Sequence, residues 1–248
     1  MALPRIEWLE ETGSTNAEVR SRALEGERGP LWIAARRQTA GRGRRERVWQ
    51  GLEGNLFATG LYVLDRPPAQ AAELSFVTAL AVAGVCDAGL GDPERTRLKW
   101  PNDVLVDGRK VSGILLESGM APGGGLWLAV GVGINVRQSP ADLGRPVTSL
   151  AESGATLTRE AALDALVAAF TRAYDLWLRE GFGAIRDQWL VRAHGLGEPC
   201  VAQLAQERLT GIFADLGPDG ALRLDMASGQ RRYISAGEVF FPAAGEES

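Results

Sequence analysis

The sequence has few of the residues that build metal centres and covalent cross-links. Its 248 residues include two cysteines, Cys86 and Cys200, and one histidine, His194. Two cysteines cannot form a disulfide framework or a cysteine-based zinc site. A single histidine argues against Ser–His–Asp triads and against metal centres with several histidines. We therefore expect no metal ion bound by the protein itself.

Targeting and membrane-spanning segments are also lacking. The N-terminal segment MALPRIEWLEE is interrupted by charged residues, so it does not have the pattern of a signal peptide. The longest uncharged stretch, Leu74 to Cys86, is too short to cross a bilayer. We expect a cytoplasmic protein with no membrane partner.

Lysine is scarce. Of the 27 Lys and Arg residues only two are lysines, Lys99 and Lys110, and both lie in the stretch LKWPNDVLVDGRK. Lysine presents a compact charge where arginine presents a rigid planar fork, so this clustering points to a site in that stretch. The net charge of −4 argues against a generic nucleic-acid binder, and any anion site must therefore be local.

The composition is that of a globular protein, with 45% hydrophobic and 23% charged residues. Helices are expected at 15–25, 69–90, 158–180 and 182–193, and strands at 6–9, 31–35, 55–63 and 126–136. The first helix begins with Thr15 and Glu18, which match a capping box. Segments 104–106 and 111–116 predict a hairpin around Asp107-Gly108, a pair typical of a type I′ turn. This order lacks regular βαβ repetition and favours an α+β fold.

The pattern changes after Gly195. Short alternating runs at 200–204, 209–214, 221–225 and 232–235 are separated by turn residues. They predict a small β-barrel-like domain of about fifty residues. We expect a larger domain over residues 1–193 and a small C-terminal domain over residues 194–248.

An arginine-rich segment, RRQTAGRGRRER, carries six arginines. Gly41 and Gly43 alternate with Arg42 and Arg44, which lets backbone N–H groups approach a ligand closely. Trp49 follows and offers a flat face for stacking. Arginine, glycine and tryptophan together suit a phosphorylated small molecule that carries a ring.

Other motifs exclude two common nucleotide-binding classes. In the segment from Gly131 to Asn135, GVGIN, no third glycine opens a helix, so it is no dinucleotide-binding motif. The sequence also contains no Walker A motif. Glycines within a strand indicate close backbone approach to a neighbour or a ligand.

As a set, these motifs resemble the bacterial biotin protein ligases of the monofunctional type. The matching segments are Ser14-Thr15-Asn16, Gln38 to Arg45 with Trp49, Lys99 to Asp103, Lys110 to Leu115, and Gly131 to Asn135. They follow the order and spacing of that family and cover most of the chain. The resemblance implies an α+β fold with a mixed β-sheet flanked by helices, similar to class II aminoacyl-tRNA synthetases, and a small C-terminal SH3-like β domain.

The resemblance also implies a two-step reaction in the domain of residues 1–193. ATP, which carries Mg²⁺, activates biotin to biotinyl-5′-AMP. A lysine of the biotin carboxyl carrier protein of acetyl-CoA carboxylase then takes the biotin. Family members often form homodimers, so the resemblance leaves a homodimer open here, and the sequence itself does not determine the oligomeric state. The ligase motifs begin close to Met1, so we expect no repressor domain and no sequence-specific DNA binding.

Site residues follow from the matching positions. By resemblance, the residues expected to contact biotin are Ser14, Thr15, Asn16, Gln38, Gly41, Arg42, Gly43, Arg44, Lys110, Gly113, Ile114 and Gly131. Those expected to contact ATP or the adenylate are Arg44, Arg47, Trp49, Asn102, Asp103, Lys110 and Asn135. Lys110 resembles the lysine that bridges the carboxylate and the α-phosphate. Together with Arg44 and Asp103, which resembles the carboxylate that orients the incoming lysine, it is expected to be catalytic.

One position departs from the family pattern. The family usually reads GRGRxGRxW, and Glu46 stands here in place of the second-block glycine. We expect this carboxylate to pair with Arg42 or Arg45 and to change how the loop closes.

Two alternatives remain open. A lipoate–protein ligase shares the fold and the adenylation chemistry, but it is expected to carry an Arg-Arg-x-x-Gly-Gly-Gly loop with a histidine. A nucleic-acid-binding protein would use the arginine loop and aromatic platforms. The net charge of −4 and the short basic segment argue against the second alternative.

Overall fold

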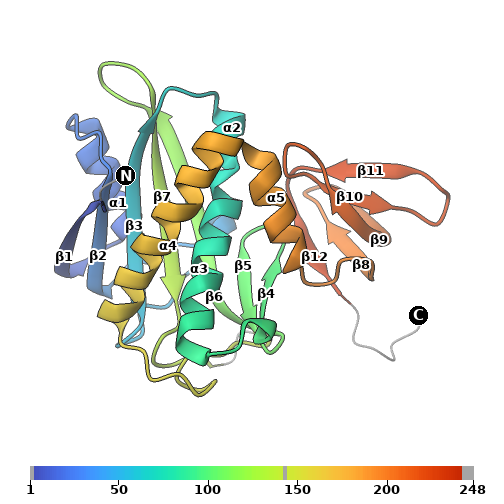
Figure 1. Ribbon diagram of the computed structural model, residues 1–248, viewed down its shortest axis with the longest axis horizontal. Coiled ribbons are helices and arrows are strands. Elements are labelled where there is room, and N and C mark those ends of the chain that lie inside the picture. The colour runs from blue at the N-terminus through green and yellow to red at the C-terminus, as the bar shows by residue number, and fades with distance from the viewer. Residues whose placement is uncertain (1–2, 142–143, 242–248) are drawn as a thin grey trace.

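Two β-sheets organise the chain in the computed structural model, which describes residues 3–141 and 144–241. The larger sheet has seven strands in the order β1-β2-β3-β7-β6-β5-β4; β1 and β2 are parallel, and the other pairs are antiparallel (Figure 1). The smaller sheet has five antiparallel strands in the order β11-β10-β9-β8-β12. The predicted α+β class with a C-terminal β domain is confirmed.

The larger sheet takes its strands from the first part of the chain. They are β1 (Arg5–Thr12), β2 (Leu31–Gln38), β3 (Leu56–Leu64), β4 (Thr96–Lys99), β5 (Asp103–Val106), β6 (Arg109–Met120) and β7 (Leu126–Ile134). The helices are α1 (Thr15–Leu24), α2 (Pro68–Ala72), α3 (Leu74–Leu90), α4 (Arg159–Glu180) and α5 (Phe182–Val191). The smaller sheet comprises β8 (Pro199–Gln203), β9 (Arg208–Leu216), β10 (Leu222–Asp225), β11 (Arg231–Ile234) and β12 (Glu238–Phe240).

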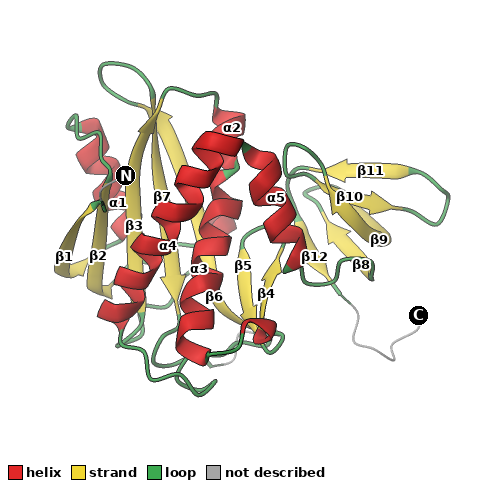
Figure 2. Ribbon diagram, in the orientation of Figure 1, coloured by secondary structure: helices red, strands yellow, loops and turns green. Residues whose placement is uncertain are grey.

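Side-chain alternation along the strands separates the two faces of the larger sheet. In β2, Trp32 and Ala34 belong to the core under α3 and α4, whereas Leu31 and Ile33 pack with Val19 of α1. This follows from the period of two in a strand. Figure 2 shows α3 and α4 lying together across one face of the sheet. The opposite face is covered only in part, by α1, and the rest of it carries the cavity described below.

One helical stretch among the described residues, Pro68–Leu90, is long and apolar enough to cross a membrane. Most of it is buried, and α3 within it contributes residues such as Leu74, Val77 and Val82 to the main core. It is a core helix between the sheet and α4.

Three local expectations need correction. The predicted capping box is wrong, because α1 begins after Ser14 and has no side-chain cap. The Thr15 hydroxyl donates to Gln38 Oε1 instead, and Glu18 accepts from the Thr12 hydroxyl at 2.6 Å. The helix expected at 69–90 is divided at Glu73 into α2 and α3. Strand β4 was not predicted, because four residues are too short for a periodic signal.

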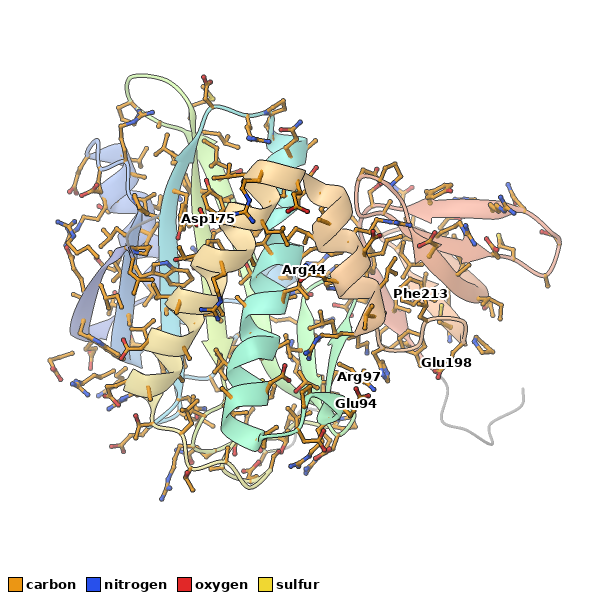
Figure 3. All side chains as sticks on the ribbon, in the orientation of Figure 1. Arg44, Glu94, Arg97, Asp175, Glu198 and Phe213 are labelled. Atoms are coloured by element: carbon orange, nitrogen blue, oxygen red, sulfur yellow. The ribbon has the colours of Figure 1, made fainter. Side chains whose placement is uncertain are left out.

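The two sheets meet at the edge strand β4. The backbone N–H of His194 donates to Leu98 O at 2.8 Å, and the indole N–H of Trp100 donates to Gly220 O at 3.1 Å. At the start of the smaller sheet the N–H of Phe213 donates to Glu198 O at 3.1 Å, and both residues are labelled in Figure 3. These contacts bring β12 beside the ends of β4 and β5, at the mouth of the cavity.

Candidate active site

A cavity of about 800 Å³ opens on the sheet face opposite α3 and α4. Its lining combines the start of α1, the end of β2, strands β5 to β7, strand β12 and the loop of residues 41–49, here called the arginine-rich loop. The lining includes Ser14, Thr15, Asn16, Gln38, Arg42, Gly43, Arg44, Arg47, Trp49, Lys99, Asn102, Asp103, Lys110, Gly113, Ile114, Gly131, Gly133, Arg145, His194, Glu238 and Phe240. Segments far apart in the chain thus converge on one volume.

Glycines create the room for this cavity. On the cavity face of the sheet, β7 carries Trp127 and Ala129, which pack under α1, followed by Gly131 and Gly133. A Cβ at Gly131 would lie 2.1 Å from Asn16 Oδ1, and one at Gly133 would lie 2.4 Å from the Trp49 ring. Because Gly131 and Gly133 have no side chains, Asn16 and Trp49 can lie against the face of the sheet, as expected for glycines within a strand.

The floor near α1 is a continuous polar network. The N–H of Thr15 donates to Gln38 Oε1 at 2.8 Å, and the Thr59 hydroxyl donates to Asn16 Oδ1 at 2.7 Å. Thr59 and Asn16 are almost fully buried. Fixed donors and acceptors of this kind suit a polar ring more than a simple hydrocarbon.

Lys110 and Asp103 form an ion pair at the other end of the cavity. The Lys110 ammonium donates a hydrogen bond to Asp103 Oδ1, and both side chains are largely buried. Burial lowers the pKa of Lys110, while the Asp103 carboxylate opposes that shift. Lys110 Nζ also lies 5.7 Å from the centre of the Trp49 ring. The pair keeps a positive charge in a site sheltered from water.

The arginine-rich loop crosses the cavity and reaches the smaller sheet. Its ends are held together by bonds from Trp49 N to Gly41 O and from Gly43 N to Arg47 O. Arg44 donates to Asn102 Oδ1 at 3.2 Å and to Gly237 O at 3.4 Å, and it is labelled in Figure 3. Burial lowers the pKa of Arg44. The guanidinium is thus placed between the two sheets, where a ligand anion can reach it.

Carboxylates other than Glu46 pair with this loop. Arg42 pairs with Glu117 at 3.3 Å, and Arg47 pairs with Glu238 through both carboxylate oxygens, at 2.7 and 2.9 Å. Among the described residues, no ion pair joins Glu46 to Arg42 or Arg45; Arg45 lies 3.8 Å from Glu238 instead, and Glu46 is exposed.

The turn at Glu46 is the one that glycine would favour. Arg45 and Glu46 have φ values of 54° and 56°, in the left-handed region. Such a conformation costs a residue with a Cβ about 1 kcal/mol relative to glycine. The tight turn forms despite the substitution of the family's glycine.

Comparison with known proteins identifies the family. Residues 8–135 match the model of the Biotin/lipoate A/B protein ligase family, and residues 195–241 match that of the Biotin protein ligase C terminal domain. The chain is 42% identical over 240 residues to a biotin–[acetyl-CoA-carboxylase] ligase of Paracoccus denitrificans, covering 94% of this chain and 99% of that protein. The chain belongs to the biotin protein ligase family.

Two further relatives place it within that family. A bifunctional ligase/repressor of Bacillus subtilis is 30% identical over 210 residues, which cover 82% of this chain and 64% of that protein. The biotin protein ligase of Aquifex aeolicus, solved in complex with biotin and ATP, is 27% identical with a TM-score of 0.81, covering 96% of this chain and 98% of that one. The similarity to this structure extends over both sheets.

Most residues expected from the biotin protein ligase motifs lie together in the cavity, but two do not. Gly41 lies outside the cavity lining. A Cβ at this position would lie 2.5 Å from Trp49 O and 2.9 Å from Gln38 Nε2. Asn135 is buried, and its amide donates to Thr148 O at 3.0 Å. In this structure the Asn135 side chain holds the segment after β7, and its expected adenylate contact stays a prediction.

Among the residues that the motifs gave no role, Lys99 and Glu238 line the cavity, and Glu117 lies outside the lining but contacts Asn16 and Arg42. Lys99 lies in a motif but received no role, and it faces the cavity beside Phe240, whose ring centre is 5.8 Å from Nζ. Glu117 and Glu238 had no signal at all, since their arginine partners are distant in the sequence. The general scarcity of lysine was the one clue to Lys99.

Proposed function

We propose that the chain is an ATP-dependent biotin protein ligase that biotinylates the biotin carboxyl carrier protein of acetyl-CoA carboxylase. The supporting observation is the cavity in which the buried Lys110–Asp103 pair and the arginine-rich loop lie over a polar floor. The Paracoccus relative carries the name of this activity, and the Aquifex structure holds biotin and ATP.

In the first step, a carboxylate oxygen of biotin attacks the α-phosphorus of ATP. The bond from that phosphorus to the bridging oxygen of the β-phosphate breaks, and biotinyl-5′-AMP and pyrophosphate are formed. Lys110 and Arg44 supply positive charge where negative charge develops between the reacting groups. The biotin ring occupies the floor formed by Thr15, Asn16 and Gln38. Mg²⁺ enters with the nucleotide phosphates.

The adenylate side of the ligand meets Arg47, Trp49 and Asn102 in this proposal. The indole nitrogen of Trp49 is buried without a hydrogen-bond partner among the described residues, so it can donate to the ligand. The loop between Gly41 and Trp49 excludes water from the acyl-adenylate, which would otherwise hydrolyse.

In the second step, the amine of the acceptor lysine attacks the acyl carbon. The bond from that carbon to the AMP oxygen breaks, an amide forms and AMP leaves. Asp103 orients the acceptor amine, because its carboxylate lies beside Lys110 at the same end of the cavity. The amine proton leaves with the departing products or with solvent.

We also propose a domain division, a cellular location and an oligomeric state. Residues 1–193 form the catalytic domain and residues 194–248 the small C-terminal domain. The enzyme acts in the cytoplasm and pairs as a homodimer.

Pyrophosphate release tests the proposal. The protein is incubated with ATP and either biotin, lipoate or neither, and release is expected with biotin alone. Lys110→Ala and Arg44→Ala are expected to lower the rate at least a hundredfold. Arg179→Ala, which removes an exposed arginine of α4, is the matched control. Release with lipoate alone supports the rival ligase, and biotin-dependent release that survives both cavity variants refutes the assigned site.

A further inference from the structure

Glu117 of β6 joins the floor of the cavity to the arginine-rich loop. Its Oε2 accepts from Asn16 Nδ2 at 2.7 Å, and its Oε1 lies 3.3 Å from Arg42 Nη2. The three residues are widely separated in sequence. One carboxylate therefore contacts both the buried polar floor and the side chain that begins the loop.

The strand register explains this placement. Gly113, Leu115 and Glu117 alternate on one face of β6, where Gly113 pairs with Gly133 and Leu115 with Gly131. Glu117 stands next along this row, at the end remote from Lys110. Its side chain is 30% exposed and that of Arg42 is 39% exposed; Arg42 lines the cavity, and Glu117 meets it from outside the lining.

Glu117 also determines which way the Asn16 amide points. A carboxylate only accepts hydrogen bonds, so the Nδ2 group of Asn16 must face it. The amide oxygen then faces the Thr59 hydroxyl, at 2.7 Å, in the space left by Gly131. An acceptor fixed in this direction favours a ligand ring with an N–H donor.

The two contacts of Glu117 differ in strength. Asn16 is buried, and its amide also donates to the Leu115 carbonyl and accepts from the Thr59 hydroxyl. The pair with Arg42 is exposed, and pairs of that kind contribute between 0 and about 1 kcal/mol. The contact to the loop can therefore form and break while the contact to the floor persists.

We propose that Glu117 is a positioning residue that couples ligand occupancy of the cavity floor to the position of the arginine-rich loop. Asn16 holds Glu117 beside the floor, so a ligand that bonds to Asn16 lies next to the carboxylate that draws in Arg42, and the closed loop and the bound ligand stabilise each other. This inference rests on the proposed function, because it takes biotin as the ligand of the floor.

Two variants separate the two contacts. The side-chain carbonyl of Glu117→Gln can still accept from Asn16, but the variant loses the negative charge that attracts Arg42. Glu117→Ala loses both contacts. Glu10→Gln is the matched control, because Glu10 forms an exposed pair with Arg36 at 3.2 Å outside the cavity.

The measurement is trypsin cleavage of the loop, read by mass spectrometry at Arg42, Arg44, Arg45 and Arg47. Each protein is compared without biotin and at the same fractional saturation with biotin. Biotin is expected to protect the wild type and the Glu10→Gln control. We expect the loop of both Glu117 variants to be cleaved at least five times faster at equal saturation.

Biotin-dependent kinetics complete the test. The KM for biotin is expected to rise about tenfold in Glu117→Ala and about three- to fivefold in Glu117→Gln, because lost coupling lowers biotin affinity as well as loop protection. Transfer from preformed biotinyl-5′-AMP is expected to keep its kcat in both, and thermal unfolding checks that they fold. Wild-type protection in both variants, or a raised KM with unchanged protection, overturns the coupling. Absence of biotin-dependent pyrophosphate release in the wild type instead refutes the proposed function.

Discussion

The ammonium group of Lys110 donates a hydrogen bond to the carboxylate of Asp103 across the β5–β6 hairpin. The two strands are joined by Asp107 and Gly108, with φ values of 50° and 73°, as a type I′ turn requires. A tight turn thus fixes the distance between the charged groups. In the proposed reaction, the pair would provide one cation for the adenylation step and one carboxylate for the transfer step.

The activity is expected to fall at alkaline pH through Lys110. Burial lowers the pKa of this lysine, and only its charged form stabilises the reacting anions, so the rate is lost as pH rises through that pKa. Lys110→Arg keeps its charge at high pH. It is expected to have a lower maximum rate, because a guanidinium fits this position poorly, but an alkaline limb at higher pH. The pH profile of pyrophosphate release checks this, and coinciding alkaline limbs for the two proteins would contradict it.

Gly131→Ala is expected to impair biotin binding while the protein still folds. The new methyl group would lie 2.1 Å from Asn16 Oδ1 and 2.9 Å from Leu115 O, so Asn16 must leave its position. A strain of about 1–3 kcal/mol corresponds to a loss of affinity of about five- to 150-fold. Calorimetric titration with biotin measures it.

Gly183→Ala is the matched control for that substitution. Gly183 lies in α5, and a Cβ there would meet no atom within 4 Å. Alanine in a helix is expected to raise the free energy of unfolding by about 0.5–1 kcal/mol and to leave biotin affinity unchanged. Equal biotin affinities for the two alanine variants would show that Gly131 is no part of the floor.

The elements predicted best were those determined by neighbouring residues. The hairpin at Asp107-Gly108 and the helices ended by Gly91 and Gly181 depend on local turn chemistry and periodicity. The order of the strands in the sheet was not predicted, because β7 inserts between β3 and β6 through pairing over long separations in the chain. Local patterns carry no information about such pairing.

The site was predicted in part for the same reason. Motif positions such as Lys110 and Arg44 were identified because short segments carry them. Glu117 and Glu238 were missed, since their partners Arg42 and Arg47 lie 75 and 191 residues away. The motif did not indicate that the Asn135 amide bonds to Thr148, since that bond depends on how the segment after β7 folds back.

Glu46→Gly is expected to retain activity and to change the affinity for biotin or ATP. Glu46 has a φ of 56°, which glycine adopts without penalty. Its side chain is exposed, so removing it breaks no buried contact. The substitution therefore acts on the ease of forming the loop turn. Titrations with biotin and ATP measure this effect, and identical constants for both proteins would deny Glu46 any special role.

Lys99→Met is expected to weaken ATP binding without weakening the fold. Lys99 lines the cavity, burial lowers its pKa, and no ion pair to it is seen within the described residues 3–141 and 144–241. A half-buried cation that lies over the Phe240 ring but forms no direct ion pair costs stability and is suited to an anionic ligand. Arg145 also lines this part of the cavity, so the phosphate chain of the nucleotide is the anion best placed to meet both cations.

The kinetic effect of Lys99→Met should therefore fall on the nucleotide. We expect the KM for ATP to rise about tenfold, because a lost charge-assisted contact is worth about 1.4 kcal/mol. Product inhibition by pyrophosphate should weaken, and the KM for biotin should not change. The melting temperature should stay level or rise, since an unpaired charge is removed from a half-buried position. Arg97→Met is the control, because Arg97 is a neighbour in β4 but pairs with Glu94 at 2.8 Å outside the cavity. A variant with a lowered melting temperature and an unchanged KM for ATP would show that Lys99 supports the fold and binds no phosphate.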